Sequence, residues 1–346
     1  MLFLTLIECA PVYGYQGLNS FLGSLTSSAK REVLMNLSPE LSRAAKEAVK
    51  AVYSAVALSD KGPENMTATL VDLYQDITQY LQASDVKKSC LAYSLLQSVA
   101  SASPSSLCTV ASLCLSTLIN QCAKEAHLSD QQAYLKELKG FLEVFQHYQT
   151  NENVTEVFKQ HLPSLFLLYE DLLKKENNEV QLEAISALTV LINSRLDSVR
   201  DKCDTFLDYL VKQSVMDHDN ILRKQLLTSL HVLVTENSGL RDRAIDSLTQ
   251  LVKSTSSPLA AVALVHVVTD DKSFLTVNAF LLAMIAQDIT SDNVTHVVSY
   301  TEALSQLLTR LAGDKACMNL VVNETALPLL RIVRIWCAAC SRGCKR

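Results

Sequence analysis

One spacing of apolar residues recurs along the chain and limits what the chain can fold into. Four copies of the pattern are present. Those that begin at Val180 and Leu222 lie 42 positions apart, and those that begin at Val199 and Leu240 lie 41 positions apart. Within each copy the anchors stand three or four positions apart, so they form one face of an α-helix. One helix pair cannot bury both apolar faces. A period near forty residues therefore predicts helix pairs that stack in a row and share a continuous core.

The scarcity of turn residues favours the same architecture. The 346 residues include only 8 glycines and 7 prolines, about 2% each against averages of about 7% and 5%. β-Sandwiches and barrels need more of both, because tight turns use their special backbone angles. Further apolar stripes predict helices over 38–59, 65–82, 86–102, 105–126, 129–149, 153–175, 179–194, 198–214, 219–236, 239–254, 257–269, 272–287, 292–312 and 316–340. Short polar breaks separate them.

One stretch carries a family resemblance. Leu162-Pro163-Ser164-Leu165 opens an apolar run, a polar turn follows at 174–178, and a second apolar run extends from Val180 to Leu191. This stretch resembles a HEAT repeat, whose first helix often carries a proline and whose second helix opens V-R-x-x-A-x-x-x-L. Gln181 replaces the arginine in this copy, although three of the four copies begin with Val-Arg or Leu-Arg. The resemblance is clear over 160–270. It does not distinguish HEAT repeats from armadillo repeats.

The resemblance implies an all-α fold, an α-solenoid of stacked antiparallel helix pairs. We predict an N-terminal helical segment over 1–60, continuous with a solenoid of about six to seven pairs over 61–346. Both ends are apolar, at Leu2-Phe3-Leu4 and from Leu327 to Ala339, whereas the terminal units of a solenoid need a polar outer face. We therefore expect a segment or isoform of a longer array, or an apolar terminal helix that docks on another subunit.

Motifs for catalysis or cofactor binding are missing from the sequence. It contains no G-x-G-x-x-G, P-loop, G-x-S-x-G or H-E-x-x-H pattern. Cys337-x-x-Cys340-x-x-x-Cys344 is the only metal-like spacing, and structural zinc needs four ligands, whereas Cys317 is the nearest further cysteine. We predict no enzyme activity, no cofactor and no metal.

Charge and cysteine usage indicate an intracellular protein with protein partners. The formal charge is −5 without a long Lys/Arg run, so nucleic acid is not expected as a direct ligand, because such binding needs a concentrated basic face. Most of the ten cysteines lie among apolar residues, as in a reducing compartment. No run approaches the ~20 apolar residues of a membrane span. We expect a cytoplasmic or nuclear location, or both.

The candidate binding residues follow from helical geometry. When the anchors from Leu222 to Leu233 face inward, other residues of the same helix must face outward. These residues, with their equivalents one repeat earlier, are Lys224, Thr228, His231, Thr235, Leu182, Ser186, Thr189 and Asn193. In HEAT-like arrays the second helix of each pair lines the concave side, so they could form a ladder that a partner peptide contacts. The alternative is that this face only meets solvent.

The favoured function is a non-catalytic scaffold or adaptor in a multi-subunit complex. A karyopherin-like transport receptor is an alternative, and it predicts acidic concave patches. A chromosome- or DNA-repair-associated scaffold is another, and it predicts basic residues along one edge. The basic residues that would form such an edge are Arg200, Lys202, Arg223, Lys224, Arg241 and Arg243.

Overall fold

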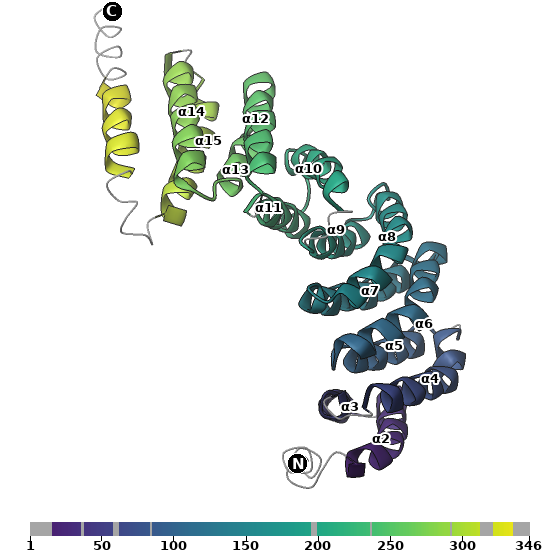
Figure 1. Cartoon of the computed structure of the whole chain (residues 1–346). Helices are drawn as coiled ribbons and strands as arrows, with labels where there is room; N and C mark the ends of the chain where they lie inside the picture. Colours follow the sequence, from purple (N-terminus) through teal and green to yellow (C-terminus); the bar gives the residue numbers. More distant parts are fainter. Residues whose placement is uncertain are drawn as a thin grey trace, which may run out of the picture. The chain divides into compact units, whose positions relative to one another are not determined.

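The computed structural model describes residues 16–35, 38–57, 62–83, 85–194, 199–235, 237–290, 293–311 and 321–334. Within these ranges the regular structure is helical throughout (Figure 1). The chain divides into two compact units, unit 1 from Met1 to Ser198 and unit 2 from Val199 to Arg346. The predicted α-solenoid of stacked antiparallel helix pairs is confirmed.

Unit 1 consists of helix pairs in two layers. Its helices are α2 (Gln16–Met35), α3 (Pro39–Ala57), α4 (Gly62–Leu81), α5 (Val86–Ala100), α6 (Pro104–Lys124), α7 (Leu128–Tyr148), α8 (Glu152–Leu172) and α9 (Asn178–Ile192). The second helix of each pair packs on the next, in the order α3, α5, α7, α9, and we call this the second-helix layer of unit 1. Helices α4, α6 and α8 pack on one another in the same way.

Polar caps keep the connections in unit 1 short. The Asp85 side chain accepts hydrogen bonds from the backbone N–H groups of Lys87 and Lys88 at the start of α5. Asn151 and Asn177 cap α8 and α9 in the same manner. Such caps satisfy backbone donors that the helix cannot pair itself. Each helix can therefore begin within a few residues of the end of the last one, which brings consecutive helices together.

The core of unit 1 runs along the seam between the layers. Phe145 of α7 and Phe158 of α8 are fully buried and stack with ring centroids 4.1 Å apart. The anchors Val180, Ala184 and Leu191 are also fully buried on α9. The inward face predicted from the repeated spacing is therefore the buried face of α9.

Unit 2 repeats the arrangement. Its helices are α10 (Arg200–Ser214), α11 (Asn220–Thr235), α12 (Ser238–Thr255), α13 (Pro258–His266), α14 (Asp271–Thr290) and α15 (Val294–Leu311). Helices α11, α13 and α15 pack in sequence and form the second-helix layer of unit 2, whereas α10, α12 and α14 form the other layer. The anchors Leu222, Leu226 and Leu230 are at most 1% exposed. Cys203 and Leu251, which belong to the copies that begin at Val199 and Leu240, are half-buried.

A buried amide joins the last described helical segment to α14. This segment opens with the π-helical turn η3 (Val322–Ala326) and continues as helix to residue 334. Asn278 of α14 is 2% exposed; its Nδ2 donates to the carbonyl of Glu324 at 2.8 Å, and its Oδ1 accepts from the Thr325 hydroxyl at 2.8 Å. Both polar ends of the amide are therefore satisfied in one arrangement.

The helices predicted between residues 38 and 312 are present, and one helix of the described residues was not predicted. Each predicted helix between 38 and 312 matches one of α3 to α15, with ends that differ by at most three residues. Helix α2 was not predicted as a separate helix. The division at residue 60 stays a prediction, and Cys337, Cys340, Cys344 and residues 335–339 of the apolar terminal helix lie outside the described residues.

Among the described residues, two helices have the length and apolar composition of a membrane span. They are α6 and residues 271–289 of α14, and half of each window is buried inside the protein. Core helices of proteins without any membrane contact pass the same test, so this is weak evidence for a span.

Candidate functional site

The structure places the eight predicted binding residues on two helices, one in each unit. Leu182, Ser186 and Thr189 are half-buried on α9 of unit 1, and Asn193, also half-buried, is the C-cap residue of that helix. Lys224, Thr228 and Thr235 are exposed on α11 of unit 2, and His231 is half-buried beside them. Each set of four lies along one face of its helix. Their role as a partner-binding ladder stays a prediction.

The threonine hydroxyls of this predicted ladder bond to their own helices. Thr228 donates to the carbonyl of Lys224 at 2.8 Å, and Thr235 donates to the carbonyl of His231 at 2.7 Å. A threonine inside a helix often bonds back to the carbonyl four residues earlier in this way. The donors are therefore engaged within α11, and Lys224 is the side chain of this face best placed to reach a partner.

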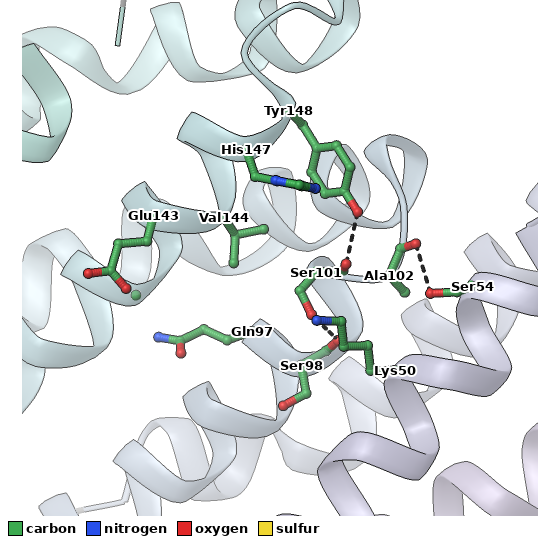
Figure 2. Close-up of a pocket in the computed structure, with 11 residues that line it drawn as sticks. Lys50, Ser54, Gln97, Ser98, Ser101, Ala102, Glu143, Val144, His147 and Tyr148 are labelled. Carbon is green, nitrogen blue, oxygen red and sulfur yellow. Dashed lines mark hydrogen bonds between the residues drawn. The ribbon is translucent and has the colours of Figure 1, made fainter. Parts of the chain in front are cut away.

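A pocket of about 610 Å³ lies in the second-helix layer of unit 1, toward the C-terminal ends of α3, α5 and α7 (Figure 2). Its lining residues come from all three helices and from the turn after α5. They are Lys50, Ser54, Gln97, Ser98, Ser101, Ala102, Gly140, Glu143, Val144, His147 and Tyr148. The sequence analysis did not identify this pocket. The glycine inside α7 was its one signal, because a glycine within a helical pattern often marks a close approach.

Gly140 lets a polar side chain lie flat against α7. The Nε2 of Gln97 donates to the backbone carbonyl of Glu137 at 2.5 Å and reaches the Glu137 carboxylate Oε2 at 3.1 Å. A Cβ atom at position 140 would lie 2.6 Å from that Nε2. Only a residue without a side chain therefore allows Gln97 to bond with α7 in this way.

Two further hydrogen bonds join the three helices around the pocket. The Tyr148 hydroxyl on α7 donates to the carbonyl of Ser101 at 2.8 Å, and the Ser54 hydroxyl on α3 donates to the carbonyl of Ala102 at 3.0 Å. Both bonds are drawn in Figure 2. They satisfy carbonyls at the end of α5 that have no partner within the helix. The neutral donors of α3 and α7 thus fix the walls.

The charged side chains at the pocket carry both signs. Lys50, Glu143 and His147 are exposed at its rim, and Glu143 lies 3.7 Å from the ammonium of Lys139. Burial raises the pKa of Glu137 to about 7, and the ammonium of Lys46 opposes that rise. The pocket and its rim therefore combine backbone carbonyls, a side-chain amide and both signs of charge.

The described residues contain no group of three or more His, Cys, Asp and Glu that could hold a metal ion. At the pocket, the hydroxyl groups of Ser54, Ser101 and Tyr148 each donate to a backbone carbonyl.

No protein-family model matches the chain. The chain is 31% identical over 193 residues to the MMS19 nucleotide excision repair protein homologs of Bos taurus and Homo sapiens, which covers 54% of this chain and 18% of each relative. The Xenopus laevis homolog is 26% identical over 221 residues, or 62% of this chain and 21% of the relative. The chain thus spans about a fifth of the length of these relatives.

Two solved engineered proteins are also similar. One has a TM-score of 0.42 at 15% identity and covers 68% of this chain and 96% of its own. The other has a TM-score of 0.32 at 14% identity and covers 96% and 97%. The assignment of the solenoid depends on the helix packing described above.

Several of the basic residues proposed to form an edge are neutralised by carboxylates. The pairs, with nitrogen–oxygen distances of 2.7 to 3.0 Å, are Arg223 with Asp217, Arg241 with Asp270, and Arg243 with Asp204 and Asp208. Lys224 is exposed, and the side chain of Arg200 is outside the described part of the chain. A phosphate backbone is attracted by uncompensated charge, so these pairs weaken the expected basic edge.

Proposed function

We propose that the chain is a non-catalytic scaffold that binds a segment of a protein partner at the pocket between α3, α5 and α7. The observation that carries the proposal is a polar pocket of about 610 Å³ whose walls are fixed by hydrogen bonds between three helices. Such a preorganised surface reduces the entropy lost on binding. The predicted ladder on α9 would extend the contact within the same layer, since α9 packs on α7.

We further propose a repair-associated setting inside the cell, in the nucleus, the cytoplasm or both. The relatives named as nucleotide excision repair protein homologs support this setting. Neutralised arginines and a net charge of −5 support protein rather than nucleic acid as the direct ligand. The karyopherin-like alternative predicts acidic patches, whereas Lys50 and Glu143 give the pocket mixed charge.

A second contact is proposed at the terminal helix. In its described part, Leu327, Leu330 and Val333 are 47%, 65% and 44% exposed. Exposed large apolar side chains on one segment are typical of an interaction surface. They support docking of this helix on another subunit.

The pocket proposal is tested by quantitative affinity capture from cells. Lys50→Glu reverses a charge at the rim, and Ser98→Tyr fills the pocket. The matched control is Lys124→Glu, which reverses an exposed charge on α6 in the other layer. The two pocket variants should fail to capture one or more proteins that wild type and the control capture. All the variants should have the melting temperature of wild type.

The same variants test the cellular setting. Cells that carry only a pocket variant should survive ultraviolet damage less well than cells with Lys124→Glu. Identical captured proteins and identical survival for all variants would contradict the proposal.

A further inference from the structure

Three basic residues lie together at the C-terminal ends of α11, α13 and α15 in unit 2. His266 is the last residue of α13, and Arg310 lies in the last turn of α15. The guanidinium of Arg310 donates to the carbonyl of Val265 and lies 3.4 Å from Nδ1 of His231, measured from Nη2. Nδ1 of His231 in turn lies 2.9 Å from the carbonyl oxygen of His266. We call His231, His266 and Arg310 the basic cluster.

The hydrogen bond of His231 determines which of its ring nitrogens carries the proton. A backbone carbonyl oxygen can only accept, so the 2.9 Å contact requires Nδ1 to donate. Nδ1 then has no lone pair for the Arg310 guanidinium 3.4 Å away. The ring and the guanidinium are therefore two donors side by side, and Nη2 gains no acceptor from His231.

No carboxylate of the described residues pairs with the basic cluster, whose contacts are with backbone carbonyls. The arginines of α11 and α12, Arg223, Arg241 and Arg243, each have a carboxylate within 3.0 Å. No described carboxylate lies within ion-pair distance of Arg310. Burial lowers the pKa of Arg310, and the pKa of His266 falls to about 4 because of burial first and then the charges of Arg310 and His231. The site thus favours an incoming negative charge.

Arg310 also has a structural role, since it satisfies a carbonyl at the end of α13. That bond uses one of the five N–H donors of the guanidinium. Part of the Arg310 side chain is exposed and His231 is half-buried, so an external group can reach the remaining donors. An arginine fork matches the two oxygens of a carboxylate.

We infer that the basic cluster binds a carboxylate side chain from an acidic segment of a protein partner. A nucleic acid fits less well, because backbone phosphates need an extended basic face and the neighbouring arginines are already paired. The inference does not rest on the pocket of unit 1, because both its residues and its ligand are different.

The test measures binding of a fluorescent Glu-Gly repeat peptide to the full chain by anisotropy at low ionic strength. A Gln-Gly peptide of equal length is the ligand control. Lys212→Gln removes an exposed positive charge from α10, in the other layer of the same unit, and is the matched control variant. Arg310→Gln should weaken binding by about tenfold or more, the effect of one lost charge-assisted hydrogen bond, whereas Lys212→Gln and Lys50→Glu should not.

Nuclear magnetic resonance of the wild-type protein keeps the test independent of the folding of any variant. With labelled histidine, the ring signals of His231 and His266 should move as the Glu-Gly peptide is added, while those of His147 and His161 in unit 1 stay fixed. Equal binding of the Gln-Gly peptide, or equal weakening by Lys212→Gln, would overturn the inference. Displacement of the peptide by a single-stranded oligonucleotide at lower concentration, with the same dependence on Arg310, would assign the site to phosphate instead.

Discussion

The pocket of unit 1 and the basic cluster of unit 2 occupy equivalent places in their units but differ in charge. Each lies toward the C-terminal ends of three consecutive helices of a second-helix layer. In unit 1 the carbonyls there accept from neutral groups, Ser54 and Tyr148. In unit 2 they accept from Arg310 and His231. Helix ends always leave carbonyls that need donors, and the donor that the sequence supplies decides whether the surface becomes neutral or cationic.

The two regions also differ in how acid and base should affect them. Glu137 beside the pocket has a raised pKa, because burial disfavours its charged form. His266 in the basic cluster has a lowered pKa for the same reason. High pH should therefore weaken the first region, and low pH the second.

The largest expected effect comes from removing the core beneath the pocket. Phe145→Ala should destabilise unit 1 by about 3–5 kcal/mol, because a large buried side chain leaves a cavity. Hydrogen exchange followed by mass spectrometry should show faster exchange in α6 to α9 and little change in unit 2. Leu248→Ala, at a fully buried position of α12, is the reciprocal control. Equal acceleration in both units would show that they unfold together, and the comparison would lose its basis.

Glu137→Gln tests the pH response of the pocket region. The folded-state pKa of Glu137 is about 7 against an ordinary 4.5, so its favourable contribution exists below pH 4.5 and is lost as the pH rises through 7. The variant should be more stable than wild type by about 1–3 kcal/mol at pH 8 and equal to it near pH 4. Urea unfolding at both pH values measures this difference. A gain of the same size at both would exclude ionisation as the cause.

His266→Gln tests the opposite response in the basic cluster. The folded-state pKa is about 4 against an ordinary 6.5, so the unfolded chain takes up the proton first and wild-type stability falls between pH 6.5 and 4. The variant should reduce that loss by about 1 kcal/mol, a value that allows for solvent screening of a partly exposed ring. Hydrogen-exchange rates of the α13 amides at pH 7 and pH 5, compared between wild type and the variant, measure this loss of stability. If the variant lost as much stability in acid as wild type, a group other than His266 would be responsible for the loss.

The smallest effect concerns the close contact between α5 and α7. Gly140→Ala gains about 1 kcal/mol of helix propensity but displaces Gln97 and breaks its bonds to Glu137, so its net effect in wild type should be near zero. In a Gln97→Ala background the same change should stabilise by about 1 kcal/mol. A double-mutant cycle by thermal unfolding measures this coupling. Additive effects would mean that Gln97 moves aside without loss.

The sequence predicted the helices well because their signals are local. The spacing of Val180, Ala184 and Leu188 defines the buried face of α9 without reference to other helices. Helix α2 was missed because its sequence is rich in serine and contains glycine, which lower helix propensity. Tertiary packing offsets this, since Ala29 and Val33 are buried and α2 packs on α3.

The sites could not be predicted in the same way, because each depends on the ends of three helices far apart in sequence. Gln97 and Gly140 meet only because α5 and α7 stack side by side. The basic cluster likewise joins His231 to Arg310, 79 positions later. His231 was selected because it lies on the outward face of α11, and nothing local indicated its neighbour. The packing of successive helices brings these residues into contact and so creates both sites.

The amide of Asn278 has a consequence for how residues 321–334 pack on α14. Its carbonyl and its amino group each need a particular partner, which Thr325 and Glu324 supply. A slide of the last segment along α14 by one turn, about 5.4 Å, would strand both groups in an apolar seam, and each stranded group costs about 1–3 kcal/mol. Apolar contacts can re-form after such a shift, whereas the two hydrogen bonds of this amide form in one alignment only. Residues 321–334 are therefore held in register against α14 by polarity and not by shape alone.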